Sequence, residues 1–181
     1  MRTYGLVFSL AFMLLFGSSA KSQEISVFAG GLFPGHGTVN GQSTPLDRGP
    51  IYGVRLTTGF AAFLKLEAAL ALSNDFLFPH NVAGVTGAKG ILVNANLAAD
   101  IPVGKRFVPF LTAGLGFMHQ YGSNNLPVGT KFNVNYGGGL KLPRLFGPAG
   151  LRFDARGYTA THVFSRSVNM FELSGGIMVS F

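Results

Sequence analysis

Three residue types that together can activate a nucleophile occur near the end of the chain. His162 precedes Ser165, and the acidic Glu172 follows in the next predicted strand. A histidine that removes the proton of a serine hydroxyl, with a carboxylate to orient it, is the arrangement used in nucleophilic catalysis. Polar residues are also ordinary in surface loops, where they have no chemical role. We therefore predict no catalytic residue and keep a catalytic centre at His162 as the alternative.

The other histidines do not form a metal-binding pattern. His36 and His80 lie beside Gly and Pro in predicted loops, and His119 lies at the end of a predicted strand. None has another histidine two or four positions away, so spacing gives no support to a metal site. The glycines at 137–139 fall inside a predicted strand, where glycine favours close packing rather than phosphate binding. The sequence thus predicts no metal, no cofactor and no cofactor-binding site.

Nine charged side chains in the predicted strands lie on the face opposite the apolar side chains. In 151–156, for example, Leu151, Phe153 and Ala155 alternate with two arginines and an aspartate. A Lys or Arg facing lipid at the bilayer midplane would cost roughly 2–4 kcal/mol, so the charged side is expected to face the inside of a barrel. The nine residues are Arg55, Lys65, Glu67, Asp100, Lys141, Arg152, Asp154, Arg156 and Glu172.

These nine charges would share a narrow interior. An eight-stranded barrel is just wide enough to be filled by its own side chains. Buried charges are tolerated there only when they are paired and hydrogen-bonded. Because the five cations and four anions are nearly balanced, we predict a structural ion-pair network that fills the lumen. A proton or ion path is the alternative interpretation.

The composition agrees with a membrane barrel. Only 12% of residues are charged, against roughly a quarter in soluble domains, and the mean hydropathy is +0.36. No apolar run reaches the roughly 18 residues that indicate a membrane-spanning helix. Apolar content without long apolar runs is typical of strands whose side chains alternate between lipid and lumen. A soluble β-sandwich is the rival fold, but its outer face should carry most of the charge.

Eight alternating segments, separated by turn residues, supply the strands of this barrel. The last is the clearest, because 171–181 alternates over roughly the 9–11 residues that a tilted strand needs to cross a bilayer. Closure is expected, because an open sheet edge in hydrocarbon would leave backbone groups unpaired. The predicted strands are 24–33, 50–59, 62–73, 88–101, 108–120, 131–142, 150–161 and 170–181.

The connections between these segments alternate in length. Short turns on one side and longer loops on the other are the outer-membrane arrangement, which predicts that both termini are periplasmic. The short connections are 59–61, 102–107 and 143–149, and the longer ones are 34–49, 74–87, 121–130 and 162–169.

The amino terminus has the features of a cleavable signal peptide. Arg2 is followed by an apolar stretch at 6–16 and by small residues at 17–20, so we predict cleavage after Ala20 and a barrel domain over 21–181. The formal net charge of +7 favours phosphate-bearing lipid. The basic residues do not cluster in a stripe, so nucleic acid is not an expected partner.

The alternating segments resemble a known family. The runs VPFLTAGLGF (108–117), LRFDARGY (151–158) and FELSGGIMVSF (171–181) are similar to those of the small outer-membrane β-barrel domain family, of the OmpA-like transmembrane type. The resemblance implies a multi-pass protein of the cell outer membrane. It also implies that the barrel-assembly machinery reads Ile177, Val179 and Phe181 as an insertion signal.

The expected function is non-enzymatic. We predict a structural, envelope-integrity or surface-interaction role through the extracellular loops, of which 35–49 is the longest, in a monomer surrounded by outer-membrane lipid and lipopolysaccharide. One alternative is a lipid A-modifying enzyme centred on His162. Some barrels of this size are lipid A 3-O-deacylases, but the His-x-Ser-Asn run of that family is absent here. A narrow pore for small solutes is the other alternative.

Overall fold

The computed structural model describes residues 23–39, 42–74, 76, 88–101, 103, 106–121, 129–163 and 166–181. The predicted signal peptide over 1–20 lies outside these residues, so its cleavage stays a prediction. The described residues form ten β-strands. Within the same ranges, no helix is long and apolar enough to cross a membrane.

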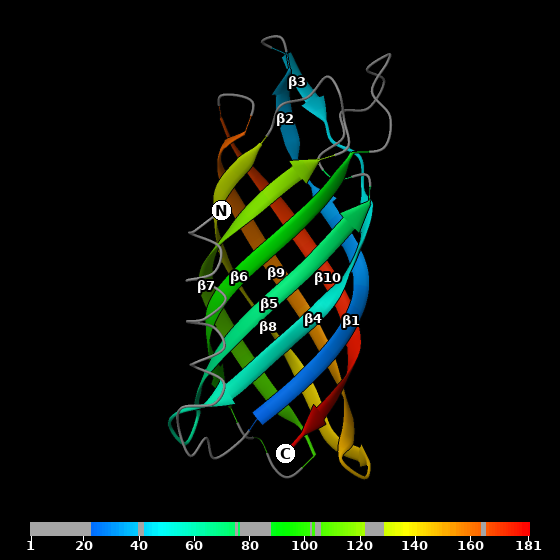
Figure 1. The fold of residues 1–181 in the computed structure, drawn as a ribbon, viewed down its shortest axis with the longest axis vertical. Helices are drawn as coiled ribbons and strands as arrows, with labels where there is room; N and C mark the ends of the chain where they lie inside the picture. The colour runs from blue at the N-terminus through cyan, green and yellow to red at the C-terminus, as the bar shows by residue number, and fades with distance from the viewer. Residues whose placement is uncertain are drawn as a thin grey trace, which may run out of the picture.

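Eight of the strands close into a single antiparallel barrel with the order β1-β10-β9-β8-β7-β6-β5-β4 (Figure 1). The barrel closes where β1 pairs with β10, from Glu24 opposite Ser180 to Pro34 opposite Met170. The prediction of an all-β, eight-stranded, up-and-down barrel is therefore confirmed. Its strands are β1 (Gln23–Pro34), β4 (Gly49–Gly59), β5 (Leu64–Asn74), β6 (Lys89–Asp100), β7 (Val108–Tyr121), β8 (Thr130–Phe146), β9 (Ala149–Val163) and β10 (Arg166–Ser180).

The first long connection contains a hairpin that the sequence did not predict. β2 (His36–Val39) pairs with β3 (Gln42–Pro45) in a separate two-stranded sheet. This hairpin stands beyond one end of the barrel, opposite the end where the C-terminus lies (Figure 1). We call the end with the hairpin the loop end and the other the turn end.

Both connections of β9 are shorter than predicted. At the turn end, β8 continues to Phe146, and only Gly147 and Pro148 separate it from β9. Gly147 has φ +66°, a conformation that glycine adopts without steric cost. At the loop end, β10 already begins at Arg166, opposite Val163, so the predicted loop over 162–169 is wrong. In both places backbone pairing continues after the apolar alternation has ended.

A bulge interrupts β8 just before its turn. Arg144 has φ +57° and is the single non-glycine residue with positive φ in the described ranges. The β8–β9 register shifts between Leu142 and Phe146. Gly150 faces the bulge, where an added Cβ would lie 2.4 Å from the carbonyl oxygen of Leu142. The absence of a side chain at Gly150 therefore allows β8 to bend back over β9.

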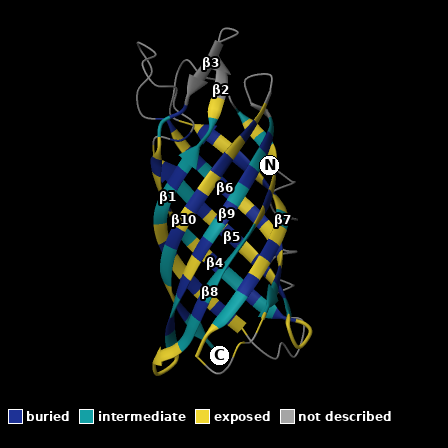
Figure 2. Ribbon diagram, turned by 180° about the vertical axis from the view of Figure 1, so that it is seen from behind, coloured by how far each residue is buried: buried dark blue, intermediate teal, exposed yellow. Residues whose placement is uncertain are grey.

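Burial alternates along the greater part of the barrel wall, as the checkered pattern of Figure 2 shows. Outward side chains such as Val27, Leu70 and Leu115 are exposed, whereas eight of the nine predicted lumen charges are buried. Arg55 is only 1% exposed. This arrangement is the reverse of a soluble domain, in which charged groups face outward.

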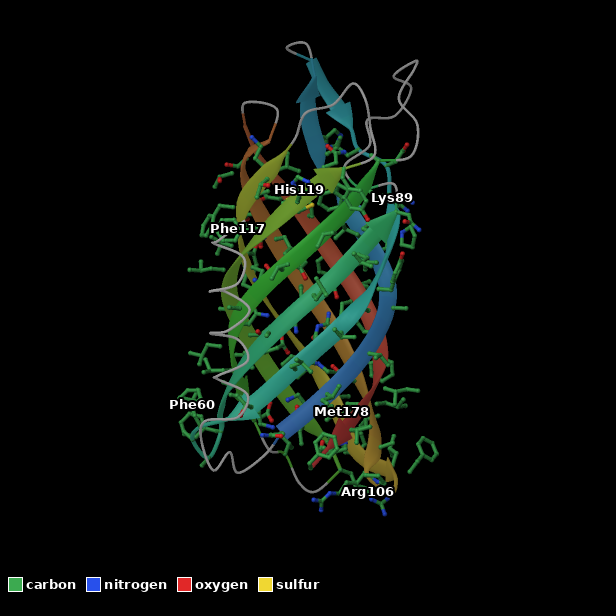
Figure 3. All side chains as sticks on the ribbon, viewed as in Figure 1. Phe60, Lys89, Arg106, Phe117, His119 and Met178 are labelled. Carbon is green, nitrogen blue, oxygen red and sulfur yellow. The ribbon has the colours of Figure 1, made fainter. Side chains whose placement is uncertain are left out.

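Exposed aromatic side chains mark both ends of the outer surface. Phe60 and Phe107 lie at the turn end, and Phe117 and Tyr121 lie near the loop end. Figure 3 shows Phe60 and Phe117 pointing away from the barrel.

The interior of the barrel contains apolar side chains as well as the charged ones. At the loop end, a cluster of buried apolar side chains fills the bore. Its members come from the strand ends next to the loops and include Leu32, Ile51, Leu92, Met118 and Met170. This apolar cluster covers the charged residues that lie further down the barrel.

Candidate functional site

All nine predicted lumen residues lie inside the barrel, and eight of them are buried. Asp100 is partly buried, at the turn-end limit of β6. The strands that supply them are β4 (Arg55), β5 (Lys65 and Glu67), β6 (Asp100), β8 (Lys141), β9 (Arg152, Asp154 and Arg156) and β10 (Glu172).

Asp154 is the centre of an arginine cluster in the middle of the barrel. Its Oδ2 lies 3.2 Å from Arg55 Nη1 and 3.0 Å from Arg152 Nε. Its Oδ1 lies 2.8 Å from Arg156 Nη2. The period of two along β9 places Arg152, Asp154 and Arg156 on the same face, so the strand itself brings two of these cations to the carboxylate.

Two glutamates complete the arginine cluster. Glu67 Oε2 lies 2.6 Å from Arg152 Nη2, and its Oε1 lies 2.8 Å from Arg156 Nη1. Glu172 Oε1 lies 2.6 Å from Arg55 Nη2. Three arginines therefore face three carboxylates, and each arginine contacts two of them.

A second cluster, formed by two lysines and two carboxylates, lies towards the turn end. Lys141 Nζ is 2.8 Å from Glu24 Oε2 and 2.8 Å from Asp100 Oδ1. Lys65 Nζ is 2.8 Å from Asp100 Oδ2 and also contacts Glu24. We call this group the lysine cluster. It contains no net formal charge.

Glu24 is the functional residue that the sequence reasoning missed. The first strand was predicted to begin at this residue, and the sequence pattern does not show on which side of the sheet a charged residue at a strand boundary lies. The available signal was its parity, because Glu24 and Ser26 alternate with the apolar Ile25 and Val27. With Glu24 included, the lumen holds five cations and five anions, so its formal charges balance.

Neutral groups satisfy the remaining acceptors of the arginine cluster. Tyr158 donates its hydroxyl to Glu172 Oε2 at 2.5 Å, and Asn96 donates to Glu67 Oε1 at 2.8 Å. The Arg55 guanidinium carbon lies 3.5 Å from the centroid of the Phe28 ring. Buried ion pairs need such additional partners to offset the cost of removing charges from water.

Of the three candidate catalytic side chains, the structure describes the surroundings of Glu172 alone. Both carboxylate oxygens of Glu172 have partners in the lumen, namely Arg55, Ser174 and Tyr158. His162 belongs to β9, and Ser165 lies outside the described residues. Glu172 therefore belongs to the arginine cluster.

Of the other histidines, the two that the structure describes are exposed. His119 faces outward, with Nδ1 2.9 Å from Thr130 Oγ1 and its ring stacked on Tyr121. His36 is exposed at the start of β2, and His80 lies outside the described residues. Across the described ranges, no group of three or more His, Asp or Glu side chains could hold a metal ion.

The residues of the expected insertion signal end the barrel. Ile177 is exposed on the outer face of β10, and Val179 is partly buried. Phe181 is exposed, and its backbone N–H donates to the Gln23 carbonyl at 2.9 Å. The two described ends of the chain therefore meet at the turn end. Recognition of these residues by the assembly machinery stays a prediction.

Comparison with known proteins identifies the fold. No protein-family model matches the chain, and no curated protein matches its sequence significantly. Among solved structures, the chain is similar to Neisserial surface protein A, with a TM-score of 0.65, 14% identity, and coverage of 88% of this chain and 97% of that one.

Two further structures have the same architecture. The outer membrane protein OprG of Pseudomonas aeruginosa has a TM-score of 0.61 and 13% identity over 91% of this chain and 98% of that one. The outer membrane enzyme PagL has a TM-score of 0.50 and 16% identity over 84% and 97%. At these identities the likeness shows a shared barrel fold, which is found in enzymes and non-enzymes alike.

Proposed function

We propose that the chain is an integral protein of the bacterial outer membrane, with a non-enzymatic structural or surface-interaction role. The observation that supports this most strongly is the reversal of polarity across the wall. The ten barrel-strand charges named above gather in a balanced interior, and the outward side chains between the strand ends are largely apolar. A closed sheet with an apolar exterior fits hydrocarbon, because all its backbone groups are paired internally.

In the orientation that we propose, the turn end faces the periplasm and the loop end faces outward. Residues 23 and 181 are joined by backbone hydrogen bonds at the turn end. The β2–β3 hairpin extends beyond the barrel at the loop end (Figure 1). We propose that surface contacts are made by this end.

The first experiment is fractionation of Gram-negative cells that express the whole chain. We expect the protein in the outer-membrane fraction, resistant to extraction with alkaline carbonate and released by detergent. The folded barrel should also migrate differently on gels before and after heating. Recovery in the soluble periplasmic fraction without detergent would contradict the proposal.

The filled lumen favours a scaffold over a pore. The arginine cluster, the lysine cluster and the apolar cluster occupy successive parts of the bore. We expect no steady single-channel conductance from refolded protein in planar bilayers. A reproducible single-channel conductance, seen with protein from two separate preparations, would instead support a narrow pore.

Lipid A analysis separates the scaffold from an enzyme. The fold likeness to PagL makes the lipid-modifying alternative worth testing directly. We expect identical lipid A mass spectra from cells with and without the protein. A change in acyl-chain content that is lost in His162→Ala and retained in His119→Ala would establish the enzymatic alternative.

A further inference from the structure

Two adjoining grooves indent the outer wall of the barrel across β1, β10, β9 and β8. The groove nearer the loop end has a volume of about 450 Å³ and is lined by residues that include Phe33, Tyr136 and Phe171. The second groove continues towards mid-wall, has a volume of about 540 Å³, and is lined by residues that include Phe153 and Leu173. Ala155 lines both grooves. We call the pair the wall groove.

The strand register explains why the wall is hollow here. Ala29 lies opposite Gly175 across the β1–β10 pair, and Ala155 lies opposite Gly138 across β8–β9. Larger side chains stand around these small ones, including Phe33 and Phe171, which face each other across β1–β10. Both grooves are open on their outer side, so they could hold an acyl chain along the wall without enclosing a whole ligand.

A cation stands at the loop end of the wall groove. Arg48 is exposed, and its guanidinium carbon lies 5.6 Å from the centroid of the Phe33 ring. The neighbouring Asp47 is partly buried. Polar groups flank the same groove, because Asn169 accepts a hydrogen bond from Thr159 at 2.9 Å and the Tyr136 side chain is exposed.

A cation at the loop end, followed by an apolar groove along the wall, matches an amphiphile that has an anionic headgroup and an acyl chain. A phosphate at the level of Arg48 would be attracted by roughly 1 kcal/mol per basic residue. An acyl chain below it would fill the apolar hollow and restore the van der Waals contacts that a void lacks. The loop end is the end that we propose to face the outer leaflet, where the phosphorylated lipid is lipopolysaccharide.

We propose that the wall groove holds an acyl chain of lipopolysaccharide, with Arg48 beside a lipid A phosphate. This inference deepens the proposed function and rests on the outer-membrane orientation given there. It assigns a lipid-binding site to the side of the barrel formed by β1, β10, β9 and β8.

The test uses native mass spectrometry of the full chain, extracted in mild detergent from cells that make a short-chain lipopolysaccharide. We expect the wild-type barrel to retain one lipopolysaccharide molecule. Ala155→Phe fills the groove and should abolish retention. Ala68→Phe is the matched control, because Ala68 is exposed on β5, diametrically across the barrel from β9.

A second pair of variants tests the headgroup contact. Arg48→Gln should raise the lipopolysaccharide concentration that half-saturates the delipidated barrel about five-fold, the ratio that corresponds to the loss of one basic residue near a phosphate. Lys89→Gln is its control, since Lys89 is an exposed cation near the loop end on β6 (Figure 3). We expect Lys89→Gln to be half-saturated at the same concentration as the wild type.

A fluorescence titration keeps the inference testable even if Ala155→Phe fails to fold. The chain contains no tryptophan, so a single introduced indole reports on its own position. Purified lipid A should change the emission of Phe171→Trp with saturation at one lipid per barrel. It should not produce a saturable change in Leu70→Trp, on the opposite wall.

Three outcomes would overturn the inference: equal retention in Ala155→Phe and Ala68→Phe, equal half-saturating concentrations in Arg48→Gln and Lys89→Gln, or a phospholipid as the retained molecule. If the protein is found in the outer membrane but retains no lipopolysaccharide, only this inference fails. Recovery of the protein as a soluble species would instead remove the proposed function.

Discussion

Asp154 contacts the guanidinium groups of three arginines, more than either glutamate of the arginine cluster does. All its cationic partners are at least 98% buried in their side chains. Removing one partner of a buried ionic network leaves uncompensated charge, which costs more than the network itself contributes to stability. The stability of the barrel is therefore expected to depend on charge balance rather than on the number of ion pairs.

Asp154→Asn should be strongly destabilising. It leaves three buried arginines facing two carboxylates, and we expect the free energy of unfolding to fall by about 3–5 kcal/mol. Urea-induced unfolding in detergent micelles, followed by far-ultraviolet circular dichroism, measures the loss. Thr130→Ala is the control, because Thr130 is exposed on the outer face and its loss should change stability by less than about 0.5 kcal/mol.

A second substitution should compensate for the first. In Asp154→Asn combined with Arg152→Met, two clean pairs remain, Arg55 with Glu172 and Arg156 with Glu67. We expect the double variant to recover most of the lost stability in the same unfolding measurement. A double variant less stable than Asp154→Asn alone would mean that the contacts, and not the balance of charge, stabilise the lumen.

At the scale of single strands, the bulge of β8 holds the backbone of one residue in a strained conformation, and a substitution can relieve this strain. Arg144 has φ +57°, a conformation that costs a non-glycine residue roughly 1–2 kcal/mol. Arg144→Gly should therefore stabilise the barrel by up to about 1 kcal/mol, as measured by urea unfolding. Arg144→Ala removes the same charge and keeps the strain, so it should give no such gain.

The two faces of a strand should respond oppositely to charge. Ala95 is exposed at the middle of β6, and Ala95→Arg should destabilise the membrane-inserted barrel by roughly 2–4 kcal/mol. The equivalent change near a strand end, Tyr121→Arg, should cost only about 0–1 kcal/mol. Unfolding in phospholipid vesicles measures both. Equal, small costs at the two positions would contradict burial of β6 in hydrocarbon.

Sequence alternation was sufficient to predict the barrel strands, because one face is apolar and the other carries the charges. It could not predict where backbone pairing continues without that alternation, which is why the bulge at Arg144 and the short connection before Arg166 were missed. Glu24 escaped because its only signal was parity at a strand boundary. The partners within the lumen, such as Arg55 with Glu172, depend on curvature and closure, which no local pattern encodes.

For the whole molecule, the barrel and the β2–β3 hairpin are separate sheets. Replacing residues 36–45 by a Gly-Ser linker of the same length should leave the barrel closed, because the hairpin strands pair only with each other. A flexible loop of similar length changes the closure entropy little, so we expect unfolding free energies within about 1 kcal/mol of each other. Loss of the heat-dependent gel shift in this variant would show that the hairpin is needed for closure.

The ionic contacts of the lumen also constrain the kinetics of assembly. Arg55 meets Asp154 across 99 positions of the chain and Glu172 across 117. Such pairs cannot form until β4 has approached β9 and β10, and contacts of high sequence separation slow folding. A sheet that has not closed would expose unpaired charged side chains to the membrane. Insertion is therefore expected to be a late, all-or-none event, and the period of greatest aggregation risk falls before β1 and β10 meet.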